Sequence, residues 1–167
     1  MKTKHAEYES LGEPGKRGFE DLECYKLALM VTMHDLAQTL PPEEKYDLAA
    51  QIRRSSKCIS ANIAEGYGRY HYLDSLRFYS VARGELNETL AHLINARLLG
   101  YVEQEYFEHV YKLIRKVESI LNGYMSYVRR RREGRKEYGD RTISDGTSEY
   151  EPGVEFDLQN DKSGGLE

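Results

Sequence analysis

The sequence predicts an all-α protein that folds as an up-down-up-down antiparallel four-helix bundle. Apolar residues recur at spacings of three and four through residues 19–132, and this period places them on one face of each helix. The only prolines in this segment are the adjacent Pro41 and Pro42, which separate the first two helices and interrupt none. The other links are short, and short links make neighbouring helices antiparallel.

The first predicted helix runs from about Glu20 to about Thr39 and ends at the two prolines. Pro42 suits the first turn of the second helix, because proline has no N–H group to leave unpaired there. Gly66 and Gly68 predict the end of that helix, since glycine readily takes the left-handed conformation that follows many helices. The predicted buried positions are Leu22, Tyr25, Leu29, Met33, Leu36 and Leu40 in the first helix and Ala49, Ile52, Ser56, Ile59 and Ile63 in the second.

The third predicted helix begins near Asp74 or Ser75, either of which can cap its first N–H groups, and it ends at Gly100. The fourth helix follows after a very short link and has the most regular period in the chain. The predicted stripes are Leu76, Tyr79, Ala82, Leu86, Leu90, Leu93 and Arg97 in the third helix and Phe107, Val110, Ile114, Val117, Leu121, Tyr124 and Val128 in the fourth.

A second stripe on the fourth helix comprises Tyr106, Leu113, Ile120 and Tyr127, which lie seven residues apart. A bundle helix needs about three apolar positions in seven to fill its own core, and this helix has more. Because the excess includes tyrosine, a residue enriched at protein interfaces, the stripe predicts self-association. The alternative is a wide face covered by the chain's own helices, with the tyrosine hydroxyls reaching water.

The two flanks of the predicted bundle differ from it in composition. Residues 1–18 combine glycine, proline and charges without an apolar period, and they predict a flexible arm. Residues 133–167 predict a disordered acidic tail, because they have too few large apolar residues to offset the entropy lost on ordering. The chain has a formal net charge of −4, and residues 134–167 hold nine acidic against four basic residues, so the bundle itself is close to neutral.

The sequence predicts a cytoplasmic protein without membrane partners. Charged residues follow Met1 where a signal peptide would have an apolar core, and no stretch approaches the roughly 20 apolar residues of a membrane span. The two cysteines, Cys24 and Cys58, are expected as free thiols in a reducing compartment, and a place in the core is favoured for them.

The sequence does not predict an enzyme. Two groups come nearest to a di-iron site, Glu85, Glu88 and His92 in the third helix and Glu105, Glu108 and His109 in the fourth, but the Glu-x-x-His spacing that such bundles use is absent. Glu85, Glu88 and Glu108 are therefore expected on a solvated face. No nucleophile elbow, phosphate-binding loop or dinucleotide fingerprint occurs. We expect neither catalytic residues nor a metal or other cofactor.

Local basic patches are the candidate nucleic-acid-binding sites, because a basic field over the whole domain is absent. Phosphates would contact the arginines and lysine, while unpaired bases would stack on tyrosines such as Tyr67, Tyr70 and Tyr72. The alternative is that Arg53 and Arg54 pair with acidic residues across an oligomer interface and that the tyrosines serve packing. The candidates are Arg53, Arg54, Lys57 and Arg69 around the second helix and Arg129, Arg130, Arg131 and Arg132 after the fourth.

Three residues near the end of the second helix form a predicted structural signature: Asn62, Glu65 and Gly66. Asn62 borders the apolar face, so that burial would require a hydrogen bond, which helix or loop backbone can supply. Glu65 lies where the helix dipole disfavours an anion, and it needs a cationic partner such as Arg69.

Three stretches, FEDLECYKLA, QIRRSSKCISANIAEGYGR and LRFYSVARGELNETLAHLINARLLGY, resemble the four-helix bundle proteins encoded in intervening sequences of bacterial 23S ribosomal RNA genes. The resemblance covers residues 19–128. Ser55 and Ser56 stand where the family more usually has alanine, and Ser60 stands where it usually has proline. The helix kink that a proline would introduce is therefore not expected here.

The resemblance implies a homopentamer without catalytic residues. It also implies a similarity in fold to accessory proteins of diversity-generating retroelements, which bind nucleic acid and cooperate with a reverse transcriptase. We therefore expect a non-enzymatic, homo-oligomeric protein that associates with RNA or DNA, with a reverse transcriptase or another protein as a further candidate partner. The alternative is a protein-interaction scaffold that acts through its oligomeric surface and its acidic tail, where residues 149–158 mix acids with isolated apolar side chains.

Overall fold

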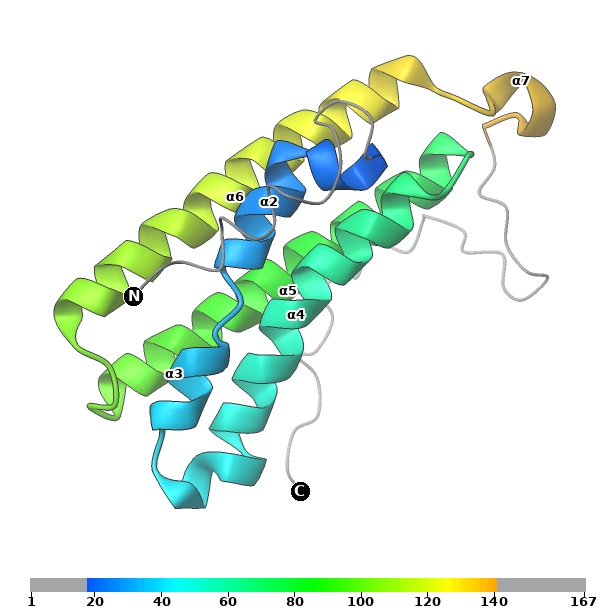
Figure 1. Ribbon diagram of the computed structural model, residues 1–167. Helices are drawn as coiled ribbons and strands as arrows, with labels where there is room; N and C mark the ends of the chain where they lie inside the picture. The colour runs from blue at the N-terminus through cyan, green and yellow to red at the C-terminus, as the bar shows by residue number, and fades with distance from the viewer. Residues whose placement is uncertain (1–17, 141–167) are drawn as a thin grey trace, which may run out of the picture.

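The computed structural model describes residues 18–140, and within this range every regular element is a helix (Figure 1). The predicted all-α class is confirmed. The predicted arm, apart from Gly18, and the acidic tail beyond Asp140 lie outside the described residues. The elements are η1 (Gly18–Asp21), α2 (Glu23–Met30), α3 (His34–Thr39), η2 (Pro42–Tyr46), α4 (Leu48–Tyr67), α5 (Tyr72–Leu98), α6 (Gln104–Arg131) and α7 (Arg135–Tyr138).

Helices α2, α4, α5 and α6 pack around a common core, with α2 against α4 and α6, and α5 against the same two helices. Residue pairs along α4 and α5 run in opposite directions: Ser55 bonds to Thr89, whereas Gly66, further along α4, faces Tyr79. The two helices are therefore antiparallel, as their short connection predicts. None of the described helices is long and apolar enough to cross a membrane.

The first helix is divided, and the prediction of one continuous helix over residues 20–39 is wrong. Helix α2 ends at Met30, α3 begins at His34, and the intervening Val31 and Met33 turn into the core with exposures of 1% and 3%. A hydroxyl of α4 stabilises this break, because the Met33 N–H donates to Ser56 Oγ at 3.3 Å. The break thus places two apolar side chains inside without leaving this buried N–H unpaired.

The break also changes which face of α2 is buried. Cys24 and Ala28 lie inside, whereas the predicted Leu22, Tyr25 and Leu29 are only partly buried. The core position predicted for Cys24 is confirmed, and burial raises the pKa of its thiol to about 11. The thiol is therefore protonated at neutral pH and is a poor nucleophile.

The predicted buried faces of α4, α5 and α6 agree well with the structure. All five predicted positions of α4 are buried, and so are the six apolar positions of α5 from Leu76 to Leu93. On α6 the central positions are buried, while Phe107, Tyr124 and Val128 pack against the core with partial exposure. Helix α4 runs without interruption through Ser60, as expected in the absence of proline.

The helix ends show three corrections. Helix α4 begins at Leu48, after the separate helix η2 that Pro42 starts, and α5 begins at Tyr72 rather than near Asp74 or Ser75, neither of which caps it. Gly100 has a φ of +79° and ends α5 as predicted. Neither Gly66 nor Gly68 has a positive φ, so their predicted left-handed conformation is wrong. Gly66 lies inside α4, where a Cβ atom would come within 2.5 Å of the Tyr79 ring. It is glycine because the two helices approach closely there.

Candidate nucleic-acid interface

The basic residues in the first half of α4 are largely engaged within the chain. The Arg53 guanidinium donates to the Lys45 carbonyl oxygen at 3.0 Å. Arg54 forms an ion pair with Glu88 of α5, an acid of its own chain rather than of a second copy. The Lys57 side chain makes no hydrogen bond or ion pair with the described residues. Of the three, only Lys57 therefore keeps its charge without a partner in this part of the chain.

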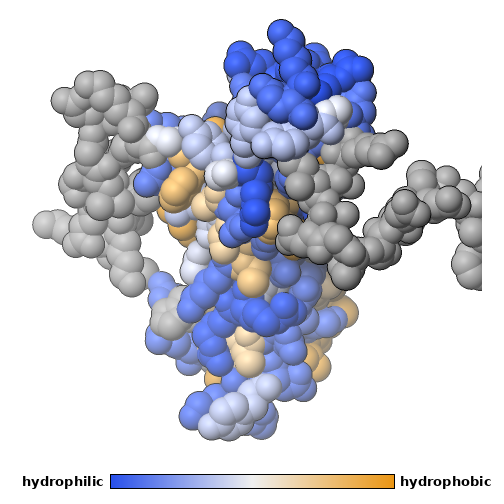
Figure 2. All heavy atoms as spheres, turned by 90° about the vertical axis from the view of Figure 1, so that its right-hand side faces the viewer, coloured by the Kyte–Doolittle hydropathy of each residue, from blue (hydrophilic) through white to orange (hydrophobic). Residues whose placement is uncertain are grey.

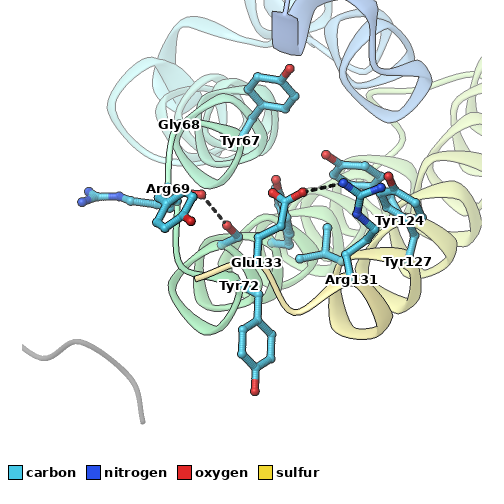
Figure 3. A pocket seen from close by; sticks show the side chains of 12 residues that line it. Tyr67, Gly68, Arg69, Tyr72, Tyr124, Tyr127, Arg131 and Glu133 are labelled. Carbon is cyan, nitrogen blue, oxygen red and sulfur yellow. Dashed lines mark hydrogen bonds and ion pairs between the residues drawn. The ribbon is translucent and has the colours of Figure 1, made fainter. Parts of the chain in front are cut away.

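Arg69 lies beyond the far end of α4, separated from Arg53 and Arg54. It forms the predicted ion pair with Glu65, and its guanidinium lies 4.7 Å from the centre of the Phe78 ring. Figure 3 shows that this side chain points away from the neighbouring cavity, so that Arg69 lines the cavity without directing its charge into it.

A pocket of about 470 Å³ opens where the C-terminal ends of α4 and α6 meet the N-terminal end of α5 (Figure 3). Tyr67 projects from α4 on one side, and Tyr124 and Tyr127 project from α6 on the other. Tyr72 points away from the cavity. The lining residues are Tyr67, Gly68, Arg69, Tyr70, Tyr72, Ser75, Tyr79, Tyr124, Tyr127, Val128, Arg131 and Glu133.

Three of these tyrosines form a ladder from the core to the surface. The ring centres of Tyr79 and Tyr124 lie 5.4 Å apart, and Tyr124 stacks on Tyr127 at 6.0 Å. Burial raises the pKa of Tyr79 and of Tyr124 above the ordinary value, so that both phenols stay neutral hydrogen-bonding groups. Tyr127, at the outer end, is 46% exposed, so that part of its side chain is accessible to a ligand.

Four arginines follow this outer tyrosine in the sequence, and one of them, Arg131, contacts its ring. The Arg131 guanidinium lies 5.8 Å from the Tyr127 ring centre and donates to Glu133 at 2.8 Å. Arg129 and Arg130 are exposed and make no hydrogen bond or ion pair with the described residues. Arg132 ends the helix in a left-handed conformation with a φ of 51°. Two cations whose side chains have no partner in the described chain therefore lie at the end of α6, outside the pocket lining but at the same end of the bundle.

Residues 133–140 fold back onto the α4–α5 connection, whereas the sequence predicts disorder from residue 133. The Tyr72 N–H donates to the Glu133 carbonyl oxygen at 3.0 Å, and the Tyr72 hydroxyl donates to Asp140 at 2.8 Å. Tyr70 donates to Glu137 at 3.1 Å, and Arg135 pairs with Asp140. Polar contacts of these tyrosines therefore order a segment that has little apolar surface to bury.

The hydrogen bond between Tyr72 and Asp140 shifts the pKa values of both groups. The hydrogen bond from Tyr72, together with the charge of Arg135, holds the pKa of Asp140 below its ordinary value. The same contact helps burial to raise the pKa of the Tyr72 phenol. Asp140 is therefore ionised at neutral pH, and its contact with Tyr72 is fully formed there and weakens only as the pH falls through the lowered pKa.

The signature residues of α4 have structural contacts. The Asn62 amide donates to the Cys58 carbonyl oxygen at 2.8 Å, which is the backbone bond expected for it. Glu65 has its predicted partner in Arg69. Gly66 contacts Tyr79, which links the close approach of α4 and α5 to the floor of the pocket.

The second stripe of α6 is exposed only at its ends. Leu113 and Ile120 are partly buried against the chain's own core, whereas Tyr106 and Tyr127 are 40% and 46% exposed. Tyr127 also lines the pocket. The part of the stripe that is left for a second copy of the chain is therefore centred on Tyr106.

Glu88 joins Arg54 to His92, whose Nε2 lies 3.5 Å from the Glu88 carboxylate. Burial, and then the charge of Glu88, raise the pKa of the nearby Glu85. Within residues 18–140 no group of three potential metal ligands comes together. The face that resembles part of a di-iron motif in sequence thus holds an ion-pair network. Cys58 beside it is only partly buried, so the core position favoured for this cysteine is wrong.

The sequence does not reveal the pocket, because its walls come from three helix ends. The sequence suggests Tyr67 for stacking on a base and Arg131 for contact with a phosphate, but it does not place them together. It predicts Tyr79 and Tyr124 only as core residues. The three-residue spacing of Tyr124 and Tyr127 is a signal that could have pointed to a shared aromatic face. Glu133 carries no such signal, since it belongs to the segment predicted to be disordered.

The described chain is a helical bundle with a tyrosine-lined, arginine-rimmed pocket at one end. It belongs to the family of 23S rRNA-intervening sequence proteins, whose family model matches residues 20–123. The matched range contains α2 to α5 and most of α6, and it stops one residue before Tyr124. The α6 wall of the pocket and Glu133 thus lie beyond the match.

Among solved structures, the chain is similar to a protein of unknown function from the S23 ribosomal protein family of Bacteroides thetaiotaomicron. The two are 24% identical, with a TM-score of 0.57, and the alignment covers 61% of this chain and 97% of the other. At this identity the likeness shows the fold alone. No curated protein matches the chain significantly.

Proposed function

We propose that the chain is a non-enzymatic RNA-binding protein that contacts single-stranded RNA through the pocket end of its bundle, residues 66–79 and 124–140. The observation that carries the proposal is the exposed Tyr127 at the same end of α6 as Arg129 and Arg130, whose side chains have no partners among the described residues. Proteins that bind single strands combine such cations, which contact phosphates, with aromatic rings, on which bases stack. The description of the family refers to 23S rRNA, and this favours RNA over DNA.

The local charge supports the same location. Residues 129–140 contain six basic and three acidic residues, whereas the whole chain has a net charge of −4. Figure 2 shows the face at this end, where hydrophilic side chains dominate and hydrophobic ones are limited to small separate patches. A local cationic surface on an acidic chain attracts phosphate with moderate strength, and salt weakens that attraction.

We also propose that the protein self-associates, in agreement with the homopentamer that the resemblance implies. A ring of copies would repeat the pocket end and raise the overall affinity for one RNA strand. The exposed Tyr106 supports an interface on α6 away from the pocket. Light scattering should give a mass well above the 19.3 kDa of one chain, and Tyr106→Arg should reduce it. A monomeric wild-type protein would contradict self-association and leave RNA binding to be tested on the monomer.

RNA binding is tested by fluorescence anisotropy with a labelled single-stranded RNA and a labelled hairpin at several salt concentrations. The wild-type protein should prefer the single strand, and its affinity should fall as salt rises. If Arg129 and Arg130 each contact one phosphate, the variant Arg129→Ala/Arg130→Ala should reduce the slope of log affinity against log salt by about 1.4.

The matched control is Arg53→Ala/Arg54→Ala, which also removes two arginines. These side chains already bond to Lys45 and Glu88, so the control should change the slope far less. If both variants reduced the salt slope equally, the RNA interface would include α4 as well. No binding of either RNA near physiological salt would refute the proposed function. Light scattering should show that all proteins assemble alike.

A further inference from the structure

The pocket has the size of a site for one small ligand. Its volume of about 470 Å³ lies within the roughly 300–1,000 Å³ range of small-molecule pockets. Tyr67 and Tyr127 face the cavity from α4 and α6, and both are more than two-fifths exposed (Figure 3). Both side chains therefore keep aromatic surface that a planar ligand can contact. A nucleobase, which is planar and aromatic, suits such walls.

Glu133 supplies the chemistry that distinguishes one base from another. Among the described residues that line the pocket, it alone carries a carboxylate. Its side chain extends into the cavity opening beside Arg131 (Figure 3). One carboxylate oxygen accepts the bond from Arg131 at 2.8 Å, and the other accepts no bond from the described residues. The side chain is 57% exposed, so that a ligand can reach it.

The position of Glu133 does not depend on its carboxylate. Its main-chain carbonyl oxygen accepts the bond from the Tyr72 N–H at 3.0 Å, and this bond anchors the residue beside the pocket. Replacing the carboxylate by an amide therefore leaves the anchor in place. The variant Glu133→Gln tests the chemistry of the side chain and spares the fold.

A carboxylate favours a base that presents two adjacent donors. Guanine presents N1–H and the N2 amino group side by side on its Watson–Crick edge, and a carboxylate can accept from both. Adenine and cytosine each place an acceptor nitrogen beside their single amino group, and uracil flanks its N–H with two carbonyl oxygens. These acceptors would face the negative charge of Glu133, so the other three bases are disfavoured.

We propose that the tyrosine pocket binds a single unpaired guanine nucleotide, with the base against the tyrosine rings, its Watson–Crick edge on Glu133 and its phosphate toward the arginines at the end of α6. The inference deepens the proposed function and rests on it. It assigns the base preference to residues 124–133, which lie beyond the family match, and it makes Arg131 a ligand-facing cation, while Arg69 is turned away.

The test is calorimetric titration of the full-length protein with GMP, AMP, CMP and UMP. GMP should bind about tenfold more tightly than the other three, which is typical of one bidentate contact to a base. Glu133→Gln should abolish this preference. Tyr127→Leu should weaken all four nucleotides and keep their order, because stacking does not depend on the base edge. The matched control is Glu137→Gln, which removes a carboxylate of the same segment outside the pocket lining and should keep the preference for GMP.

The outcomes separate the pocket from the proposed RNA function. Equal binding of the four nucleotides, or a guanine preference that survives Glu133→Gln, would overturn the guanine site even if RNA binds. The guanine preference without any RNA binding would support the site and overturn the RNA function. If both hold, a guanosine-containing single strand should bind more tightly than a guanosine-free one, and Glu133→Gln should remove that difference.

Discussion

The pocket end of the bundle and the middle of α4 are packed by different means. At the pocket end, Gly66 lets α4 approach the ring of Tyr79, and the ring in turn contacts Tyr124. In the middle, small polar side chains fill the space, and the Thr89 hydroxyl donates to Ser55 at 2.9 Å. The first region depends on shape, whereas the second depends on satisfying buried polar groups.

The difference predicts how each region responds to substitution. A close contact between a backbone and an aromatic ring has no room for an added atom. A buried hydroxyl that serves a main-chain N–H can lose an atom with little change in volume, but the N–H is then left unpaired. Changes that add atoms should therefore be most harmful at the pocket end, and changes that remove polar atoms should be most harmful in the middle.

The largest effect is expected from Gly66→Ala. The added Cβ would lie 2.5 Å from a carbon of the Tyr79 ring, so α4 and α5 must separate. We expect a loss of about 3 kcal/mol in the free energy of unfolding, at the upper end of the cost of overpacking. Urea denaturation of the variant and of the wild type measures this difference in the free energy of unfolding.

The control for this prediction is Gly84→Ala on α5, where a new Cβ meets nothing within 4 Å. This change should stabilise the protein by about 0.5–1 kcal/mol, because alanine favours helix more than glycine does. The combination of Gly66→Ala with Tyr79→Leu should recover part of the loss. Strictly additive effects of the two changes would contradict the proposed contact.

An intermediate effect is expected from Ser56→Ala in the middle region. The Ser56 hydroxyl accepts the Met33 N–H at the break between α2 and α3, and its loss leaves that N–H buried and unpaired. We expect destabilisation of about 1–2 kcal/mol by thermal or urea denaturation. Ser60→Ala is the control, since Ser60 donates only to Lys57 of its own helix, and it should change the stability by less than about 0.5 kcal/mol. Equal effects of the two variants would argue against the role of Ser56 at the break.

The smallest effect, with the opposite sign, is expected from Glu85→Gln. Burial, and then the charge of Glu88, raise the pKa of Glu85, so the ionised carboxylate is less stable in the folded chain than in the unfolded one. Such a group destabilises the fold at neutral pH and ceases to do so as the pH falls through the raised pKa. Glu85→Gln should therefore be more stable than the wild type at pH 7, and the difference should shrink in acid. A difference that does not change with pH would contradict this explanation.

The buried faces of α4, α5 and α6 and the end of α5 at Gly100 could be predicted from the sequence, because apolar spacing and glycine conformation are local properties. The break after Met30 could not be predicted, since it depends on the Ser56 hydroxyl of another helix. The partner of Glu65 could be predicted because Arg69 follows one helical turn later.

By itself, the sequence determined the class of fold, the buried faces of α4, α5 and α6 and the residue types available for RNA contacts, because helical period and charge are local properties of the sequence. Only the tertiary structure decided which of those residues meet. In the tertiary structure, Arg53 and Arg54 bind partners within the chain. Tyr67 of α4 lines the same cavity as Tyr127 of α6, and Glu133 lies at the opening of that cavity. The physical reason is that a pocket forms where helix ends converge, and this convergence depends on contacts between residues far apart in the sequence, such as Gly66 with Tyr79 and Tyr72 with Glu133.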